Sequence, residues 1–209
     1  MIAVIDYGAG NLRNVCKALE HVGAQLTVTS DVHQLERADK IVLPGVGAFA
    51  DCLHNLQSRS LFDSLRQIAL SGKPLLGICV GMQLLFEVGE EMGLWPGLGL
   101  ISGKVVRFNF GDQPGDSATH LKVPHIGWNQ IEPTQTHPLL KGVPAGSYAY
   151  FVHSFYPIVA DTNDVIATTH YGYSFASVVA KGKIWGIQFH PEKSQDVGLQ
   201  MLRNFVEAA

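Results

Sequence analysis

The sequence predicts an α/β fold with a mostly parallel central sheet, helices on both faces and extra antiparallel strands in the C-terminal half. The first half of the chain alternates short apolar runs with segments of helical periodicity, which is typical of parallel sheets. Of the 209 residues, 46% are hydrophobic and 16% are charged, enough for a well-buried core. The second half is richer in short β-branched and aromatic runs between Gly, Pro and Asn, which predicts antiparallel strands.

The N-terminal half begins with a strand and a helix. Ile2–Asp6 is an apolar run, and Asn11–His21 places Leu12, Val15 and Leu19 on one helical face. Further strands are expected at Gln25–Thr29, Lys40–Leu43 and Pro74–Cys79, and further helices at Leu61–Leu70 and Val80–Glu87. We expect the third strand to stop at Pro44-Gly45. The alternation predicts a parallel sheet.

The C-terminal half predicts strands at Tyr148–His153, Val165–Thr169, Phe175–Ala180 and Lys183–Phe189. Lys181-Gly182-Lys183 is typical of a hairpin turn. These strands either extend the central sheet antiparallel or form a small second sheet. Asp196–Val206 predicts a closing helix, and the polar, glycine-rich stretch Asn109–His120 a mobile loop. We expect one domain spanning residues 1–209.

Composition excludes several classes of function. Fifteen basic and 18 acidic residues give a net charge of −3, so nothing indicates binding to nucleic acid or to an anionic membrane. Three scattered cysteines without a CxxC pair argue against a disulfide framework and a thiolate zinc site. The first residues resemble a strand rather than a secretion signal, so we expect a reducing cytoplasmic location.

The most informative segment is Gly77-Ile78-Cys79-Val80-Gly81-Met82-Gln83, where a strand turns abruptly into a helix. This pattern is typical of a nucleophile elbow with cysteine in place of serine. Glycines two residues on either side let neighbouring backbones approach, and the helix N-terminus favours a thiolate. The amide of Val80 is then suited to an oxyanion hole. The alternative is a buried, inert cysteine, the interpretation we keep for Cys16 and Cys52, which lie in helical patterns.

His190 is the candidate base for this cysteine. It follows the apolar run Lys183–Phe189, so it reaches the same edge of the sheet as Cys79 if the two strands are parallel. Glu192, beyond Pro191, can orient the imidazole. The alternative for His190 is an ordinary surface histidine. A metal site at His-Pro-Glu lacks a third ligand at a suitable spacing, so we expect no metal and no cofactor.

Two glycine-rich turns remain to be interpreted. Gly8-Ala9-Gly10 follows the first strand, but Arg13 occupies the third glycine position of a dinucleotide fingerprint. Pro44-Gly45-Val46-Gly47 offers backbone amides to an anion facing the cysteine, with a plain tight turn as the alternative.

These segments together resemble the class I glutamine amidotransferases over nearly the whole chain. The residues that carry the resemblance are Pro44–Gly47, the elbow around Cys79, and Gly186-Ile187-Gln188-Phe189-His190-Pro191-Glu192. Within the family, Asp6–Leu12, Pro124–Asn129 and Tyr150–Ser154 resemble the glutaminase subunits of imidazole glycerol phosphate synthases. The resemblance implies a flavodoxin-like, doubly wound fold.

The resemblance also implies a reaction and its residues. Glutamine would be hydrolysed to glutamate and ammonia through a thioester on Cys79, with His190 as base and Glu192 holding His190. The amides of Val80 and of Val46 or Gly45 would form the oxyanion hole. Gly47, Gln83 and Ser154 correspond to the glutamine-binding positions of the family.

By the same resemblance, ammonia passes to a separate cyclase subunit built as a (β/α)₈ barrel, which serves histidine biosynthesis. The positions that correspond to the partner-facing surface are Asn11, Asn14, Trp128 and Lys193. Their alternative interpretation is an ordinary polar surface with one tryptophan at the core edge. The family further implies low activity until the partner binds its ligand, with the Val46 peptide reorienting to complete the oxyanion hole.

Three alternative functions stay open. A glutaminase of another synthase, such as that for pyridoxal phosphate, would use other segments at Pro124–Asn129 and Tyr150–Ser154. A stand-alone cysteine hydrolase would act without a partner. A non-catalytic binding subunit would have no need of Cys79, His190 or Glu192, all of which are present. Phe155-Tyr156-Pro157 departs from the family pattern and leaves glutamine contacts there open.

Overall fold

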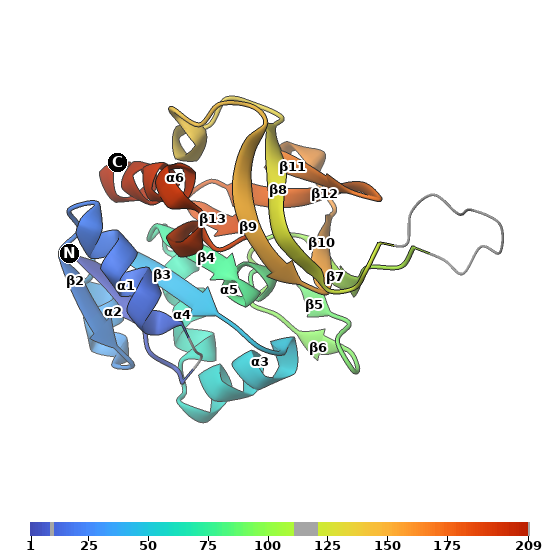
Figure 1. The fold of residues 1–209 in the computed structure, drawn as a ribbon. Coiled ribbons are helices and arrows are strands. Elements are labelled where there is room, and N and C mark those ends of the chain that lie inside the picture. Colours follow the sequence, from blue (N-terminus) through green and yellow to red (C-terminus); the bar gives the residue numbers. More distant parts are fainter. Residues whose placement is uncertain (9–10, 111–120, 209) are drawn as a thin grey trace, which may run out of the picture.

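The computed structural model describes residues 1–8, 11–110 and 121–208. Within them, strands form a nine-stranded sheet in the order β2-β1-β3-β4-β13-β12-β11-β8-β9, and a four-stranded sheet in the order β10-β7-β5-β6 (Figure 1). The large sheet comprises β1 (Ile2–Ile5), β2 (Leu26–Thr29), β3 (Lys40–Gly45), β4 (Leu75–Cys79), β8 (His125–Pro133), β9 (Ser147–His153), β11 (Val165–Tyr171), β12 (Tyr173–Lys181) and β13 (Ile184–Ile187). The expected α/β class is confirmed.

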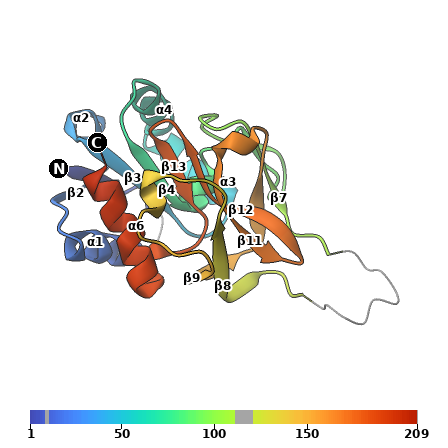
Figure 2. The ribbon, with the colours of Figure 1, turned by 90° about the horizontal axis from the view of Figure 1, so that it is seen from above.

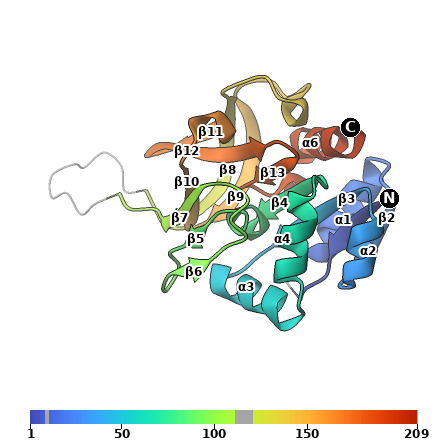
Figure 3. The same ribbon diagram turned by 180° about the vertical axis from the view of Figure 1, so that it is seen from behind.

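Helices cover both faces of the parallel part of the sheet, as expected. They are α1 (Leu12–His21), α2 (Val32–Arg37), α3 (Phe49–Ser58), α4 (Phe62–Leu70), α5 (Val80–Gln83) and α6 (Gln195–Glu207). Figure 2 shows α1 and α6 on one side of the strands and α2 and α4 on the other. Seen from behind, α3 and α4 lie beside one another (Figure 3), and the two helices pack together. Helix α2 has six residues, too few for a clear periodicity, and begins where Asp31 accepts a hydrogen bond from the amide of His33.

The parallel part of the sheet brings the two predicted site strands together. β2, β1, β3, β4 and β13 pair in parallel, with Ile184 opposite Leu75 and Ile187 opposite Ile78. β1, β4 and β13 are buried along their whole length, as expected for apolar runs covered on both faces. The prediction that the strands leading to Cys79 and His190 run parallel in one sheet is confirmed.

The strands of the second half take both arrangements that the sequence left open. β12, β11, β8 and β9 extend the large sheet antiparallel, and Gly182 (φ 57°) forms the turn between β12 and β13. The separate sheet consists of β5 (Val88–Gly89), β6 (Trp95–Pro96), β7 (Gly103–Arg107) and β10 (Phe155–Val159). Residues 111–120 of the predicted loop lie outside the described residues, as do residues 9 and 10 of the first glycine-rich turn.

Two expected boundaries were wrong. The helix expected over Val80–Glu87 ends at Gln83, because the carbonyls of residues 84–86 accept hydrogen bonds from the amides of residues 98–101 instead of from a further helical turn. β3 continues through Pro44 and Gly45, where it pairs with Ile78 and Cys79 of β4. Its pairing with β1 ends at Val42, so the missing N–H of Pro44 breaks no ladder on that side.

Among the described residues, the structure contains no helix with the length and apolar character needed to cross a membrane.

Candidate active site

Cys79 lies on a strained turn between β4 and α5. Its backbone angles are φ 56° and ψ −115°, a conformation that non-glycine residues rarely adopt. The flanking glycines are required by close backbone packing. A Cβ on Gly81 would lie 1.9 Å from the carbonyl oxygen of Leu43, and one on Gly77 would lie 2.5 Å from the carbonyl oxygen of Gly81. The expected elbow geometry is therefore present.

His190 and Glu192 form a buried pair at the end of β13. Glu192 lies on the short 3₁₀ helix Pro191–Lys193, which begins directly after His190. The imidazole Nδ1 is 2.8 Å from Glu192 Oε1, and the two side chains are 6% and 0% exposed. Because a carboxylate only accepts hydrogen bonds, Nδ1 carries a proton and Nε2 is left to act on a neighbouring group.

That neighbouring group is Cys79. Burial alone lowers the pKa of His190, but hydrogen bonds to Cys79 and Glu192, together with their charges, raise it to about 10. Both Cys79 and His190 line one cavity. The structure thus brings together the cysteine, the imidazole and the carboxylate that the sequence predicted to act in series. An imidazole that holds a proton beside a cysteine stabilises the thiolate, which is the nucleophilic form.

Asn11 takes part in this series, although the sequence placed it on a partner-facing surface. Its side-chain Nδ2 donates to Glu192 Oε1, the same oxygen that His190 contacts. Asn14, which is exposed, donates from Nδ2 to Asn11 Oδ1 at 2.7 Å. The residue spacing of α1 gave no indication of this link, since α1 and Glu192 are far apart in the chain and meet only because α1 packs against α6 and the 3₁₀ helix.

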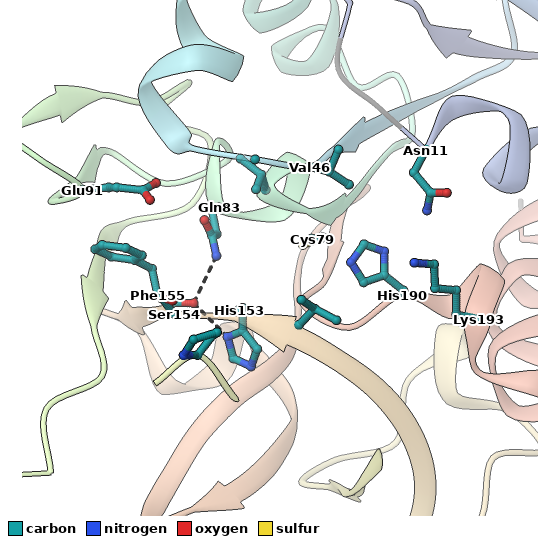
Figure 4. A pocket seen from close by; sticks show the side chains of 14 residues that line it. Asn11, Val46, Cys79, Gln83, Glu91, His153, Ser154, Phe155, His190 and Lys193 are labelled. Carbon is teal, nitrogen blue, oxygen red and sulfur yellow. Dashed lines mark hydrogen bonds between the residues drawn. The ribbon is translucent and has the colours of Figure 1, made fainter. Parts of the chain in front are cut away.

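The cavity in front of Cys79 measures about 490 Å³, within the range of small-molecule sites. The residues of the predicted site that line it are Asn11, Val46, Gly47, Cys79, Val80, Gln83, Ser154, His190 and Lys193. Figure 4 shows Asn11, His190 and Lys193 on one side, with Gln83 and Glu91 on the other. All three predicted glutamine-binding residues therefore face the space next to the cysteine.

The predicted oxyanion turn lies against the elbow. Gly45 does not line the cavity but packs beneath it, where a Cβ would lie 2.5 Å from the amide nitrogen of Gly81. The carbonyl of Val46 accepts a hydrogen bond from Cys52 Sγ at 3.5 Å. Burial raises the pKa of Cys52 to about 11, so this thiol keeps its proton. The hydroxyl of Tyr7 donates to the carbonyl of Pro44 at 2.6 Å and supports the same turn from below.

Gln83 is held in place by two acceptors. Its Nε2 donates to the carbonyl of Phe155 and to Gln188 Oε1, both at 3.1 Å, and the side chain is buried. These bonds connect the elbow to Phe155 at the start of β10 and to Gln188, which follows β13. One dashed line in Figure 4 marks the bond from Gln83 to Phe155.

Sequence reasoning missed other residues of the cavity wall, namely Glu91, Pro124, Val152, His153 and Phe155. Glu91 follows the two-residue strand β5, and its Oε2 accepts a hydrogen bond from the amide of Phe49 at 2.6 Å. A lone glutamate in an irregular segment carries no periodic signal. His153 was noticed only as part of a motif, and its position beside His190 follows from the sheet order.

The other two predicted partner-facing residues, Trp128 and Lys193, both lie near the ring of Tyr150. Trp128 is 46% exposed, and its ring lies 5.9 Å from that of Tyr150. The ammonium group of Lys193, also exposed, lies 5.9 Å from the same tyrosine ring. Trp128 and Tyr150 are opposite one another on β8 and β9. The ring of Tyr150 thus lies near both Trp128 and Lys193, of which Lys193 lines the cavity.

Within the described ranges, no three His, Cys, Asp or Glu side chains are arranged to bind a metal ion. His190 and Glu192 bind one another through Nδ1 and Oε1.

Comparison with known proteins identifies the family. Residues 3–209 match the family described as Glutamine amidotransferase class-I. Curated relatives include the imidazole glycerol phosphate synthase subunit HisH of Salinibacter ruber, 49% identical over 98% of this chain and 93% of that protein. The subunit of the same name from Methylococcus capsulatus is 50% identical over 98% of this chain and 95% of that protein.

Solved structures share the fold. PurLQS from Thermotoga maritima aligns with a TM-score of 0.73 at 18% identity, covering 98% of this chain and 96% of that one. The glutaminase domain of CTPS from Trypanosoma brucei aligns with a TM-score of 0.66 at 16% identity, covering 98% and 92%. The cysteine elbow, the imidazole–carboxylate pair and the match over residues 3–209 agree, and the chain belongs to the class I glutamine amidotransferases.

Proposed function

We propose that the chain is the glutaminase subunit of an imidazole glycerol phosphate synthase, which hydrolyses glutamine and delivers the ammonia to a separate synthase subunit. The observation that carries the chemistry is the series Cys79, His190 and Glu192 at one cavity. The curated relatives named above, about half identical over nearly their whole length, support the choice of synthase.

Cys79 acts as the nucleophile. Its sulfur forms a bond to the side-chain amide carbon of glutamine, and the carbonyl oxygen becomes an oxyanion. His190 gives its Nε2 proton to the leaving nitrogen, so that ammonia departs and a glutamyl thioester remains. His190 then takes a proton from water, which attacks the thioester and releases glutamate. Glu192 holds the imidazole in the tautomer that both steps need.

The oxyanion is stabilised by backbone amides on the two sides of the elbow. The amide of Val80 follows Cys79 directly, and a second amide comes from Val46 or Gly45 in the turn packed against it. One such donor contributes roughly 3 to 4 kcal/mol to transition-state stabilisation. The carbonyl of Val46 accepts a hydrogen bond from Cys52 Sγ, which holds the peptide between Val46 and Gly47. The activity switch that the family resemblance implies is reorientation of the neighbouring peptide, which carries the Val46 amide.

Glutamine lies along the cavity between Cys79 and Glu91. Gly47, Gln83 and Ser154 line this path, and their backbone and amide groups suit a polar amino acid. The carboxylate of Glu91 offers a partner for the α-ammonium group. No cofactor takes part in this reaction scheme.

The partner is a cyclase subunit with a (β/α)₈ barrel, bound as a heterodimer through the surface that includes Asn11, Asn14, Trp128 and Lys193. The assembled synthase acts as a lyase in histidine biosynthesis. A cytoplasmic location fits the free thiols of Cys16, Cys52 and Cys79.

The test is the full chain purified with the cyclase subunit, in wild-type form and as Cys79→Ala. We expect the variant to lose glutamine-dependent synthesis while ammonia-dependent synthesis by the complex continues. Cys16→Ala, which removes a free thiol on α1 that does not line the cavity, is the control and should retain glutamine use. Intact glutamine use by Cys79→Ala would contradict the nucleophile. A glutaminase rate that is the same with and without the cyclase and its ligand would contradict the switch at Val46.

A further inference from the structure

A chain of hydrogen bonds runs through two buried histidines, one of which, His153, lines the cavity. His125 Nδ1 lies 3.0 Å from His153 Nε2, and His153 Nδ1 lies 2.9 Å from the carbonyl oxygen of Phe155. At the other end, Asn129 Nδ2 lies 3.2 Å from His125 Nε2. The two histidines are 3% and 6% exposed. They come from β8 and β9, which pair with His125 opposite His153.

The partners at the ends of this chain determine where every proton lies. The carbonyl of Phe155 only accepts, so His153 carries its proton on Nδ1 and leaves Nε2 as an acceptor. His125 must then donate from Nδ1, which leaves its own Nε2 as an acceptor. Asn129 meets that acceptor with its amide NH₂ group. With both rings neutral, each of the three hydrogen bonds has one donor and one acceptor.

The orientation of the Asn129 amide agrees with this arrangement. Its Oδ1 accepts from the amide of Gln130 at 2.8 Å, and its Nδ2 also donates to the carbonyl of His170 at 2.9 Å. A flipped amide would lose both bonds. The side chain of Asn129 therefore presents its N–H group to His125. This fixes which atom donates in each hydrogen bond from Asn129 to the Phe155 carbonyl.

Aromatic rings enclose the pair. Phe151 and Tyr171 stack on His125, with ring centroids at 4.9 Å and 4.0 Å. Phe108 packs edge-on against His153 at 5.2 Å. Burial lowers the pKa of His125 to about 4, and burial together with nearby His125 and His190 lowers that of His153 to about 3. Both rings thus remain neutral at physiological pH.

The carbonyl at the end of this chain belongs to the cavity. Phe155 and Ser154 line it, and the carbonyl of Phe155 also accepts from Gln83 Nε2, so one oxygen holds both the histidine pair and Gln83. Figure 4 shows the side chains of His153 and Gln83 directed at this oxygen. A shift of the Phe155 carbonyl would therefore move residues 153–155 and, at the same time, break the hydrogen bond to Gln83.

We propose that His125 and His153 are positioning residues for glutamine, a neutral pair with one proton arrangement that fixes the Phe155 carbonyl and, through it, Gln83 and the cavity wall. This inference rests on the proposed glutaminase function. Of the two histidines only His153 lines the cavity, and both act through the Phe155 carbonyl rather than on Cys79, so their effect falls on substrate binding rather than on the chemical step.

The test measures glutaminase kinetics of the full chain in complex with the cyclase subunit, for His153→Leu and His153→Asn. The leucine removes the donor to Phe155, whereas the asparagine amide keeps an N–H close to the place of Nδ1. We expect the KM for glutamine to rise about tenfold in His153→Leu, the order of one lost hydrogen bond, and to return most of the way towards wild type in His153→Asn.

KM separates positioning from a merely structural role, because a smaller folded fraction lowers the apparent kcat and leaves KM unchanged. His137→Leu is the matched control, since His137 is a partly buried histidine that packs against Trp185 and lines a different cavity. An unchanged KM in His153→Leu, or the same rise in both His153 variants, would overturn the proposal. A wild-type complex without glutaminase activity would instead contradict the proposed function, and the positioning role with it.

Long-range ¹H–¹⁵N spectra of the full chain provide a second measurement that needs no variant. We expect both histidines to be neutral at about pH 7, each with its proton on Nδ1. A proton on Nε2 of either ring, or a charged ring, would overturn the proposed arrangement.

Discussion

Two hydrogen bonds converge on one oxygen of Glu192. Oε1 accepts from His190 Nδ1 and from Asn11 Nδ2, while Oε2 is buried and has no hydrogen-bond partner among the described residues. A buried carboxylate with so few partners depends strongly on each of them. Asn11, on a left-handed backbone turn (φ 67°), is in turn held by Asn14. The orientation of the imidazole is thus sensitive to a side chain from the other end of the sequence.

Removal of this support should weaken catalysis. We expect Asn11→Ala to lower kcat/KM for glutamine by about tenfold or more, because the lost bond is charge-assisted and partly buried. Asn14→Ala removes only the neutral bond to Asn11 and should lower it by less than about fivefold. Glutaminase assays at saturating concentrations of the cyclase subunit and its ligand keep differences in partner binding out of the measurement. Equal effects of the two variants would show that Asn11 does not act through Glu192.

His190 offers a direct test of the general base. His190→Asn keeps a polar side chain but has no group that can shuttle the Cys79 proton, so we expect no burst of glutamyl-enzyme on mixing with glutamine. Rapid-quench measurement of the thioester decides the point, with Cys79→Ala as the blank. A burst of wild-type amplitude would exclude His190 from the role.

The backbones of β3 and α5 lie so close together around the elbow that no side chain would fit between them. The backbone of Gly81 lies against the carbonyl of Leu43, and Gly45 lies against the backbone of residues 80 and 81. The cavity floor is therefore made of main chain, which brings the backbone amides of both elements close to Cys79. Flanking glycines in the sequence predicted the elbow, but their partners on β3 could be identified only once the strands were aligned.

The same crowding predicts the effect of a single methyl group. A Cβ on Gly81 would lie 1.9 Å from the Leu43 oxygen, so Gly81→Ala should destabilise the chain by at least about 2 kcal/mol through forced backbone movement. Gly23→Ala is the control, because Gly23 has no atom near the added Cβ and only a positive φ of 90°. It should cost about 1 kcal/mol. Urea unfolding of both variants measures the difference, and equal losses would contradict the crowding argument.

Element boundaries show where local patterns were insufficient. Tertiary hydrogen bonds end α5 early by engaging the carbonyls of residues 84–86, and they have no trace in the periodicity of Val80–Glu87. Pro44 signalled a strand end, but β3 tolerates it because β1 no longer pairs there. In contrast, the long apolar runs of β1, β4 and β13 were predictable, since burial on both faces demands continuous apolar sequence.

Three buried histidines make opposing contributions to the dependence of stability on pH. The pKa values of His125 and His153 are lowered by burial to about 4 and about 3, below the value of about 6.5 for an unfolded histidine. Below about pH 6.5 the unfolded chain therefore binds protons that the folded chain does not, and stability falls. For His190 the sign is opposite. Burial lowers its pKa, but Cys79 and Glu192 raise it to about 10, so its stabilisation is present below about pH 6.5 and is lost as the pH rises towards 10.

These signs predict a maximum in the free energy of unfolding near pH 6.5. On the acid side we expect a loss of about 2 kcal/mol from His153, and a smaller loss from His125, between about pH 7.5 and about pH 5, where most carboxylates remain ionised. On the alkaline side Cys79→Ala should flatten the decline, because the hydrogen bond to Cys79 is the largest contribution that raises the His190 pKa. Urea unfolding across this range gives the curve. A stability that stays constant from pH 7.5 to 5 would contradict the buried neutral pair.

The residues of the reaction could be recognised from the sequence because their chemistry leaves local marks. A cysteine between two glycines at a strand end, and a histidine and a glutamate around a proline, are patterns that an ordinary core does not require. The alternation of apolar runs likewise determined the α/β class, since each run must be buried on the faces that its periodicity presents.

What surrounds those residues was decided only by the tertiary structure. The link from Asn11 to Glu192 depends on the packing of α1 against α6 and the 3₁₀ helix, and the link from His125 to His153 depends on the pairing of β8 with β9. Hydrogen bonds of this kind depend on distances of a few tenths of an ångström between distant parts of the chain. Local sequence encodes which groups can donate and accept, whereas the packing of strands and helices selects which of them meet.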